Sequence, residues 1–482
     1  MDVSAAAALV DERLAAFRTQ HDIPGVAYGL LKDGELVHAS GAGTSEVGAG
    51  RTPGERDILR IASMTKSFTA VAVLLLRDRG TLRLDDPLST YLPWTADLRA
   101  AEGGPDITIR DLLAMNAGFP TDDPWGDRNE SQPIEEFDAL VSGGLTFARP
   151  PRTGFEYSNL GYALLGRVVA VASGVDYRTF VNAEILAPLG MSDTGYDEAF
   201  VPADQLVPGF APVDAGLVLE PATGPGAFSP MGGLHSSVRD LGIWVGAFHT
   251  SWTSQPRHPL GRWSLREMQE PQRLVGTTVT PATADTDQRI VTTSYAFGLM
   301  TDDDQKLGRF VSHSGGYPGY GSHMRWHPAT GWGVVALGNR TYAPCYRIGT
   351  DVMNEIVGAT LEASPLDPAA QLWLRTHEAR DVVESLLRSW DDALADQWFA
   401  PNVDLDRPRA ERAAEFARAG AALGEFNRSS RLVESTSPAQ ARWWVDGASG
   451  LATLDVLLSP ERLPRIQSLR VTPGEAPPPP PD

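Results

Sequence analysis

The stretch SMTKSFTAVAVLLLRDRG, residues 63–80, decides how this chain folds. From Phe68 to Leu76 it is nearly all apolar, which is too apolar for a helix on the surface of a protein. Gly80 can end such a helix, because glycine readily adopts the left-handed conformation of a C-cap. The sequence therefore predicts a helix here that is buried at the centre of its domain.

Lys66 is one of only three lysines among the 41 basic residues. It follows Ser63 by one helical turn, so the two side chains share a face near the helix N-terminus. A buried lysine can release its proton as its pKa falls from about 10.4, whereas a guanidinium cannot. The helix dipole would stabilise an anion beside Ser63. The pair indicates an activated serine nucleophile, the alternative being a capping serine and a solvated lysine.

Two further segments carry polar residues beside regular structure. FEYSNLGYALLG, residues 155–166, places Tyr157 and Asn159 directly before an apolar helical pattern. FVSHSGGYPGYG, residues 310–321, places His313 on a strand that runs into a glycine-rich turn. Together with the serine and lysine, these residues form three separate motifs.

With these three motifs the chain resembles the penicillin-binding-protein-like serine hydrolases: class C β-lactamases, D,D-peptidases, D-aminopeptidases and related esterases. The family motifs S-x-x-K, Y-x-N and H-x-G are read at 63–66, 157–159 and 313–315, in the family's order. The resemblance covers about residues 5–360, and it extends to the branch of penicillin-binding-protein-type thioesterases.

The resemblance implies a role for each motif residue. Ser63 would attack a carbonyl and become acylated, while Lys66 and Tyr157 would share the proton relay in an order that the sequence leaves open. Asn159 would orient the lysine and hold a substrate amide. The backbone N–H groups of Ser63 and Gly316 would form the oxyanion hole.

His313 stands where β-lactamases usually carry a lysine that attracts the β-lactam carboxylate. Histidine has an unperturbed pKa near 6.5 and is a weaker fixed charge at neutral pH. Penicillin hydrolysis is therefore a less favoured main role than ester, thioester or D-amino-peptide chemistry. We also expect His235, Ser314 and Gly315 to contact the substrate.

Composition excludes several classes of partner. The net charge of -20 and pI near 4.9 repel nucleic acid and anionic lipid. The N-terminus lacks the basic and apolar regions of a signal peptide, and no apolar run reaches about 18 residues. The single Cys345 rules out an internal disulfide and a cysteine metal cage. We expect a cytoplasmic protein without a metal or other cofactor.

An α+β fold of the serine β-lactamase and D,D-peptidase type is predicted for residues 1–365, with an antiparallel sheet flanked by helices plus an all-helical region. Asp33-Gly34 is a strong hairpin signal between two strands. Strand patterns return between 295 and 340, and the pattern over 105–290 is mostly helical. The early hairpin and the late strands are expected to complete one sheet.

A smaller α+β or β-rich accessory domain is predicted for residues 366–474. Its sequence begins with a long helical pattern over 368–399, repeats one over 409–426 and ends in three or four strands. The resemblance raises the possibility of a lipocalin-like domain, which the two helical patterns fit poorly. Residues 475–482, rich in proline, are expected to form a disordered tail.

Three functions remain open at this point. The first is an acyl-enzyme hydrolase or acyltransferase for a small ester, amide or D-amino-acid peptide. The second is a stand-alone thioesterase that cyclises a nonribosomal peptide, its acyl substrate delivered by a peptidyl carrier protein. The third is a non-catalytic binding domain on the same fold, which would be expected to lose the lysine or the tyrosine.

Overall fold

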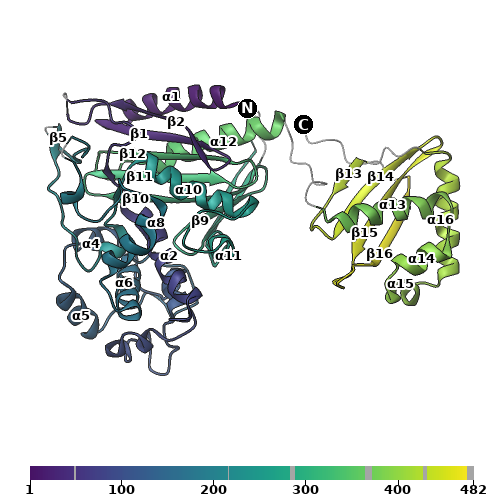
Figure 1. Cartoon of the computed structure of the whole chain (residues 1–482), viewed down its shortest axis with the longest axis horizontal. Coiled ribbons are helices and arrows are strands. Elements are labelled where there is room, and N and C mark those ends of the chain that lie inside the picture. Colours follow the sequence, from purple (N-terminus) through teal and green to yellow (C-terminus); the bar gives the residue numbers. More distant parts are fainter. Residues whose placement is uncertain are drawn as a thin grey trace. The chain divides into compact units, whose positions relative to one another are not determined.

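A computed structural model describes residues 1–47, 50–202, 204–214, 216–282, 288–363, 372–426 and 431–474. The chain divides into two compact units, Met1–Ser364 and Pro365–Asp482. The first unit combines a large antiparallel sheet with covering helices and a separate helical region (Figure 1). This architecture confirms the predicted α+β fold. No helix within the described ranges is long and apolar enough to cross a membrane.

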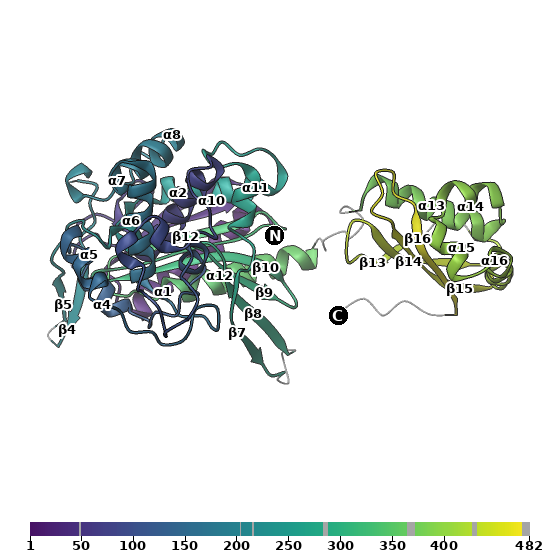
Figure 2. The same ribbon diagram turned by 90° about the horizontal axis from the view of Figure 1, so that it is seen from below.

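An eight-stranded sheet with the order β2-β1-β12-β11-β10-β9-β8-β7 is the centre of the first unit (Figures 1 and 2). All seven neighbouring pairs are antiparallel. In this order β1 pairs with both β2 and β12, so the early hairpin completes the late sheet as predicted. The strands are β1 (Gly25–Lys32), β2 (Glu35–Gly43), β7 (Arg273–Thr280), β8 (Arg289–Tyr295), β9 (Met300–Asp304), β10 (Gly308–Tyr317), β11 (Tyr320–His327) and β12 (Trp332–Gly338).

The hairpin between β1 and β2 follows directly from its turn residues. Asp33 and Gly34 both have positive φ, 53° and 88°, as a two-residue hairpin turn requires. Side chains of β1 alternate between the two faces of the sheet, and each face belongs to a separate hydrophobic core. Val26, Tyr28 and Leu30 pack on one face, and Ala27 and Leu31 pack on the other. The sheet is thus buried on both faces at this strand.

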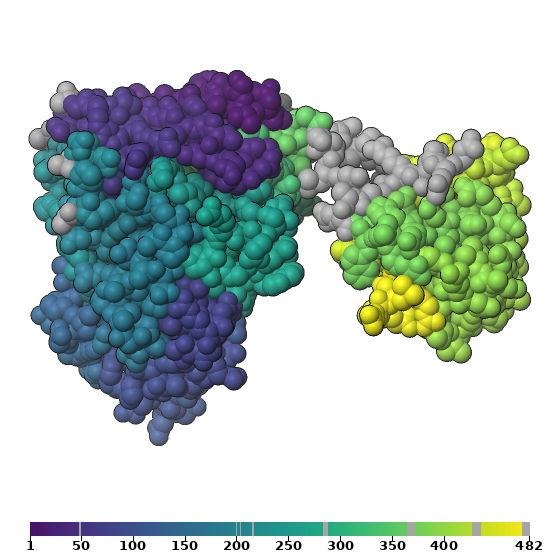
Figure 3. Space-filling view, viewed as in Figure 1, coloured from purple at the N-terminus to yellow at the C-terminus, as the bar shows by residue number. Residues whose placement is uncertain are grey.

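Helices cover both faces of the sheet. α1 (Val3–Gln20) and α12 (Cys345–Ala363) pack on one face, where their apolar residues form a common core with β1 and β12. α10 (Val238–Thr253) packs on the other face and leads into the larger core. In the space-filling view the purple surface of the N-terminal residues and the blue surface of the helical region lie at opposite ends of this unit (Figure 3).

The helical region surrounds α2 (Thr65–Asp78). Every residue of α2 from Thr65 to Leu76 is buried, which confirms the predicted central helix, and Gly80 after it has a φ of 75°. The neighbouring helices and turns are η1 (Ala62–Met64), η2 (Leu88–Thr90), η3 (Pro93–Thr95), α3 (Ile109–Leu113), α4 (Asp123–Arg128), α5 (Ile134–Ser142), α6 (Asn159–Ser173), α7 (Tyr177–Val181), η4 (Asn182–Leu186), α8 (Ala187–Leu189), η5 (Glu198–Phe200), α9 (Ser229–Gly232) and α11 (Arg262–Glu267). Short strands β3 (Leu59–Arg60), β4 (Phe210–Val213), β5 (Gly216–Leu219) and β6 (His235–Ser236) connect them.

The expectation of a mostly helical stretch over 105–290 is wrong at its end. β7 (Arg273–Thr280) and β8 (Arg289–Tyr295) pair there as antiparallel strands, and the residues of β7 are largely exposed and so lack a strong apolar pattern. The segment YAFGLM, expected as a strand, is mainly the turn between β8 and β9. Gly298 in this turn packs against α2: a Cβ there would lie 2.6 Å from the Lys66 carbonyl oxygen.

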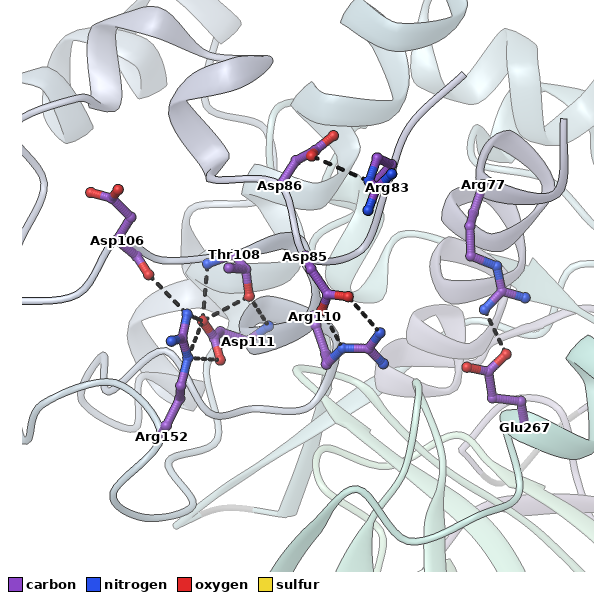
Figure 4. Close-up of polar contacts among 10 residues, drawn as sticks. All are labelled: Arg77, Arg83, Asp85, Asp86, Asp106, Thr108, Arg110, Asp111, Arg152 and Glu267. Carbon is purple, nitrogen blue, oxygen red and sulfur yellow. Dashed lines mark hydrogen bonds and ion pairs between the residues drawn. The ribbon is translucent and has the colours of Figure 1, made fainter. Parts of the chain in front are cut away.

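A polar network holds the loop that precedes Tyr157 (Figure 4). The Asp111 side chain accepts hydrogen bonds from the backbone N–H and hydroxyl of Thr108 in a capping box at the start of α3. The same carboxylate pairs with Arg152, at 2.9 Å. Farther along, Glu156 N–H donates to the Met115 carbonyl, 3.1 Å away. The chain is thereby fixed on α3 just before it enters the second motif.

The second unit is an open four-stranded antiparallel sheet with helices packed against it. The order β13-β14-β15-β16 follows the sequence, and in the described residues the sheet does not close, whereas a lipocalin closes eight strands into a barrel. The lipocalin-like possibility is therefore wrong for this unit, although its α+β character is as predicted. Its elements are α13 (Leu374–Arg388), α14 (Asp392–Trp398), α15 (Pro401–Asp406), α16 (Arg409–Leu423), β13 (Arg431–Glu434), β14 (Gln440–Gly447), β15 (Gly450–Leu458) and β16 (Ile466–Pro473).

The single long helix predicted over 368–399 is two helices in the described part of that range. α13 ends before Ser389, and the Asp391 side chain caps the start of α14 by accepting from Ala393 N–H at 2.9 Å. An N-cap aspartate favours a new helix start over continuation. The tail predicted to be disordered, 475–482, lies outside the described residues.

Loss of the Asp111 carboxylate should destabilise the first unit. Asp111→Ala removes a buried cap and the partner of Arg152, so we expect the free energy of unfolding to fall by about 1–3 kcal/mol. Asp85→Ala is the matched control, because Asp85 pairs with Arg110 at the exposed surface and should contribute less than about 1 kcal/mol. Urea denaturation followed by tryptophan fluorescence measures both, and equal losses would contradict the role of the Asp111 network.

Candidate active site

Ser63 lies in the tight turn η1 between β3 and α2. Ala62 before it has a φ of 47°, a left-handed conformation that costs about 1–3 kcal/mol for a residue with a Cβ. Strand β10 passes so close that a Cβ on Gly315 would lie 2.2 Å from the Ile61 carbonyl oxygen. Only glycine fits this approach, and the strand therefore holds the strained turn and the serine in place.

The Lys66 ammonium group is completely buried and faces Ser63. Its Nζ atom donates to Ser63 Oγ at 3.0 Å, to Asn159 Oδ1 at 2.6 Å and to the Met231 carbonyl at 2.8 Å. Burial lowers the pKa of Lys66 to about 8, against the opposing effect of nearby aspartates. Ser63 makes no capping hydrogen bond to α2, so the alternative of a capping serine and a solvated lysine does not describe this site.

Tyr157 and Asn159 enter the site from the start of α6. The Ser158 side chain caps this helix by accepting from Gly161 N–H at 3.1 Å, which directs its neighbours toward α2. The Tyr157 ring centroid lies 4.8 Å from Lys66 Nζ. Burial raises the pKa of Tyr157 well above its usual range, and hydrogen bonding with Ser63 lowers it by a smaller amount. Tyr157 is therefore a neutral phenol at the site.

His313 is buried as a neutral imidazole. Burial, with a smaller effect of the Lys66 charge, lowers its pKa to about 3. Nδ1 lies 2.6 Å from the Ser314 carbonyl oxygen, which can only accept, so the proton sits on Nδ1. Nε2 then faces the Tyr295 hydroxyl at 3.3 Å as an acceptor. His313 consequently offers no fixed positive charge to a substrate.

A cleft of about 310 Å³ opens beside the Ser63 hydroxyl. Ser314 and Gly315, which are predicted from sequence to contact the substrate, line it together with Gly316, the predicted second donor of the oxyanion hole. The pairing of β9 with β10 ends at Ser312, so in the described residues the edge from 313 onward has no strand partner on that side. An edge of this kind can receive an extended substrate through backbone hydrogen bonds. The cleft lining is Ser63, Asp123, Asp127, Tyr157, Met300, His313, Ser314, Gly315, Gly316, Ser322, Tyr342, Ala343, Pro344 and Tyr346.

His235 does not reach this cleft, contrary to the expectation from sequence. It lies on β6, paired with β3, and only 1% of its surface is exposed. Its Nε2 lies 3.4 Å from a carboxylate oxygen of Glu198. Burial lowers its pKa despite the opposing effect of Glu198. Strand β6 thus places His235 behind the turn that carries Ser63 and outside the lining of the cleft.

Sequence reasoning missed three aspartates in TDDPWGD, residues 121–127. The Asp122 carboxylate accepts from the backbone N–H groups of Asn159 and Leu160, at 2.7 and 2.9 Å, and so holds the start of α6. Asp123 accepts from the Asn159 side-chain amide at 2.9 Å. Burial raises the pKa of Asp127 to about 7. The signal in the sequence that could have identified these residues is a pair of adjacent aspartates followed, one helical turn later, by a third.

Candidate metal ligands do not gather anywhere in the described residues: no group of three or more His, Cys, Asp or Glu side chains is placed to hold an ion. His323 and His327, spaced to face one side of β11, have separate partners. His323 Nδ1 contacts the Ser314 hydroxyl at 2.9 Å, and His327 Nδ1 contacts the Thr330 hydroxyl at 2.8 Å.

Known proteins are similar to this chain in sequence and in fold. The family model described as Beta-lactamase matches residues 7–357. "Penicillin-binding protein 4*" of Bacillus subtilis (strain 168) is 27% identical over 320 residues, which are 60% of this chain and 62% of the relative. "Beta-lactamase-like protein 2" of Dictyostelium discoideum is 32% identical over 229 residues, 45% of this chain and 40% of the relative. The chain thus spans less than two thirds of the length of these relatives.

Two solved structures show the same fold at lower identity. The octameric penicillin-binding protein homologue from Pyrococcus abyssi aligns with a TM-score of 0.61 and 21% identity, over 96% of this chain and 92% of that one. The penicillin binding protein from Bacillus halodurans aligns with a TM-score of 0.56 and 22% identity, over 72% of this chain and 99% of that one.

Acylation of Ser63 should depend on the protonation of Lys66. A base acts only when it has lost its proton, so the labelling rate with an uncharged fluorophosphonate should rise with pH, reach half of its maximum near pH 8 and level off above about pH 9. The rate is measured by gel fluorescence at a series of pH values, with Ser63→Ala as the control for labelling elsewhere. A rate that does not change from about pH 6 to 9 would rule out Lys66 as the base.

Proposed function

The chain belongs to the beta-lactamase family, and on that premise we propose that it is a serine acyl-enzyme hydrolase or acyltransferase for a small ester, amide or D-amino-acid-containing peptide. The observation that carries this proposal is the contact of 3.0 Å between Nζ of the completely buried Lys66 and Oγ of Ser63, which borders the cleft. A lysine in such a position can accept the proton of the serine hydroxyl.

The proposed acylation begins at Ser63. Neutral Lys66 accepts the hydroxyl proton while Oγ forms a bond to the substrate carbonyl carbon. The carbonyl oxygen becomes an oxyanion between the backbone N–H groups of Ser63 and Gly316, both of which line the cleft. The bond to the leaving group then breaks, and the leaving group takes up one proton. The acyl group remains on Ser63 as an ester.

Tyr157 is proposed as the residue that delivers this proton. Its raised pKa keeps it a phenol, so it is a poor acceptor for the serine proton but a donor to a developing anion on the leaving group. The Lys66 ammonium, 4.8 Å from the ring centroid, can restore the phenol proton. This order assigns the acceptor to Lys66 and the donor to Tyr157, a choice that the motifs alone leave open.

Asn159 is proposed to orient the lysine. Its side-chain oxygen accepts from Lys66 at 2.6 Å, while its amide nitrogen donates to Asp123 at 2.9 Å. This fixes the amide so that its oxygen faces the lysine. In deacylation the same groups would act in reverse, activating a water or an amine that attacks the ester and returning the proton to Ser63.

A thioesterase that cyclises a nonribosomal peptide, delivered on a peptidyl carrier protein, uses all of the same residues. The thioesterases that the chain resembles carry a lipocalin-like accessory domain, and the open four-stranded sheet of the second unit gives no support of that kind. It stays the second proposal. A non-catalytic binding role is the third, and the retained Ser63, Lys66 and Tyr157 at one site argue against it.

Removal of the phenol hydroxyl should slow turnover without removing the nucleophile. We expect Tyr157→Phe to reduce kcat/KM for a para-nitrophenyl ester by about 10²-fold or more, and Lys66→Arg to be nearly as damaging as Lys66→Ala. Steady-state kinetics measures these effects, and Ser63→Ala sets the background. Near-wild-type turnover in Lys66→Arg would contradict the role of Lys66 as proton acceptor.

Hydrolysis and cyclisation give different products from one substrate. A peptidyl thioester ending in a D-residue should yield the linear acid, identified by mass spectrometry, if water resolves the acyl-enzyme. A cyclic peptide that is absent in Ser63→Ala would establish the second proposal instead. Neither product, with no labelling of Ser63 by fluorophosphonate or β-lactam probes, would support the non-catalytic role.

A further inference from the structure

The cleft beside Ser63 is acidic. Two of its lining residues, Asp123 and Asp127, are carboxylates, and no lysine or arginine lines it in the described part of the chain. They stand one turn apart on α4, so the two side chains face the same way. Buried carboxylates are usually stabilised by an ion pair. Among the described residues, neither Asp123 nor Asp127 forms an ion pair within 4 Å.

The Asp127 side chain is almost fully buried, although it forms part of the wall of the cleft. Only 3% of its surface is exposed, and one carboxylate oxygen accepts from the Tyr342 hydroxyl at 2.8 Å. Gly126 beside it allows α4 to pack closely on α6, because a Cβ there would lie 2.8 Å from the Asn159 Cβ. The fold therefore brings the Asp127 carboxylate against the reacting residues, although a charge so placed is costly without a partner.

The positive charges nearby are already engaged or stand outside the cleft. All three hydrogen bonds of the Lys66 ammonium go to Ser63, Asn159 and the Met231 carbonyl. Its pKa of about 8 means that a fraction of the molecules carries a neutral Lys66 amine near neutral pH. Arg128 pairs with Glu220 at 2.6 Å. Arg60, whose charge also acts on Asp127, pairs with Glu130. Because burial raises the pKa of Asp127 to about 7, this side chain is mostly ionised only above neutral pH. Under those conditions it faces the cleft as a carboxylate, with no lysine or arginine among the described lining residues.

Aromatic rings complete the lining. Tyr342 and Tyr346, each 46% exposed, both line the cleft, and the Tyr342 hydroxyl also holds Asp127. Aromatic faces next to carboxylates are a combination that attracts cations. His313 adds no positive charge, because its pKa of about 3 keeps it neutral. A substrate carboxylate would thus find repulsion here and no lysine or arginine among the lining residues.

We propose that the substrate of this serine site carries a protonated amine close to its scissile carbonyl, and that Asp127, with Asp123 and Tyr342, forms the subsite that receives the amine. This inference rests on the proposed acyl-enzyme function and names its substrate class: cationic acyl esters, thioesters or amides. Anionic substrates, including those with a carboxylate near the reacting bond, are disfavoured by the same groups.

Three para-nitrophenyl esters test the charge preference on the unaltered protein. The assay is run at pH 8, above the Asp127 pKa of about 7. The acyl groups are β-alanyl, whose amine is still protonated at this pH, butyryl, which has the same shape without charge, and glutaryl, which ends in a carboxylate. We expect kcat/KM to fall in that order, with β-alanyl favoured over butyryl by about 10-fold or more. Equal rates for β-alanyl and butyryl, or a higher rate for glutaryl, would overturn the proposal.

Asp127→Asn then tests the residue. The substitution keeps the shape and removes the charge, so the ratio of the β-alanyl to the butyryl kcat/KM should drop about 10-fold toward unity. Asp138→Asn is the matched control, because Asp138 pairs with Arg167 outside the cleft at 2.7 Å and its loss should leave the ratio unchanged. An unchanged ratio in Asp127→Asn, or an equal drop in Asp138→Asn, would contradict the assignment.

The two levels of the proposal fail differently. If fluorophosphonate does not label Ser63 and none of the three esters is hydrolysed above the Ser63→Ala background, the acyl-enzyme function itself is wrong. If Ser63 is labelled and the butyryl ester is hydrolysed as well as the β-alanyl ester, the function stands and the cationic substrate class is wrong. A folding defect in Asp127→Asn leaves the comparison of the three esters on wild type as the deciding result.

Discussion

Burial of the Lys66 ammonium one turn after Ser63 is the constraint on which the rest of this structure depends. An unpaired charge in a protein interior costs several kcal/mol, so the surroundings must either supply acceptors or let the group lose its proton. Here they do both. Three oxygens accept from Nζ, yet burial still lowers the pKa of the lysine to about 8. The protein thus holds a base that is partly neutral near physiological pH.

Each large element of the first unit contributes to that arrangement. β10 presses on the strained turn through Gly315, the β8–β9 turn packs on the backbone of α2 through Gly298, and α9 supplies the Met231 carbonyl. α6 carries Asn159, and Asp122 fixes its first turn. These segments come from distant parts of the chain, and only the folded unit brings them to one side chain. The acidic cleft is a consequence of the same packing, because α4 reaches the site through Gly126.

The sequence alone predicts those features that depend on short-range spacing. Asp33 and Gly34 specify the hairpin locally, and the apolar run after Lys66 specifies a buried helix, so both were predictable. Ser63, Lys66, Tyr157 and Asn159 lie within motifs, and the structure brings all four together.

Features that depend on tertiary packing were not predictable in the same way. The side chain of Asp127 is exposed or buried according to how α4 meets α6, which no local pattern encodes. His235 follows a glycine-rich segment, which suggested a pocket residue, but its strand β6 pairs with β3 behind the turn that carries Ser63. β7 is largely exposed, so its sequence has no strong alternation of apolar and polar residues. In the second unit, the helical pattern continues across Ser389 although the Asp391 cap starts a new helix.

Direct titration of Lys66 tests the central claim, and the scarcity of lysine makes it practical. Lysine labelled with ¹³C and ¹⁵N gives signals from only three side chains, and the Lys66 signal is the one lost in Lys66→Arg. The account predicts that this signal titrates with a pKa of about 8. A Lys66 signal that titrates at the ordinary value near 10.4 would show a fully charged lysine at neutral pH and would contradict the account.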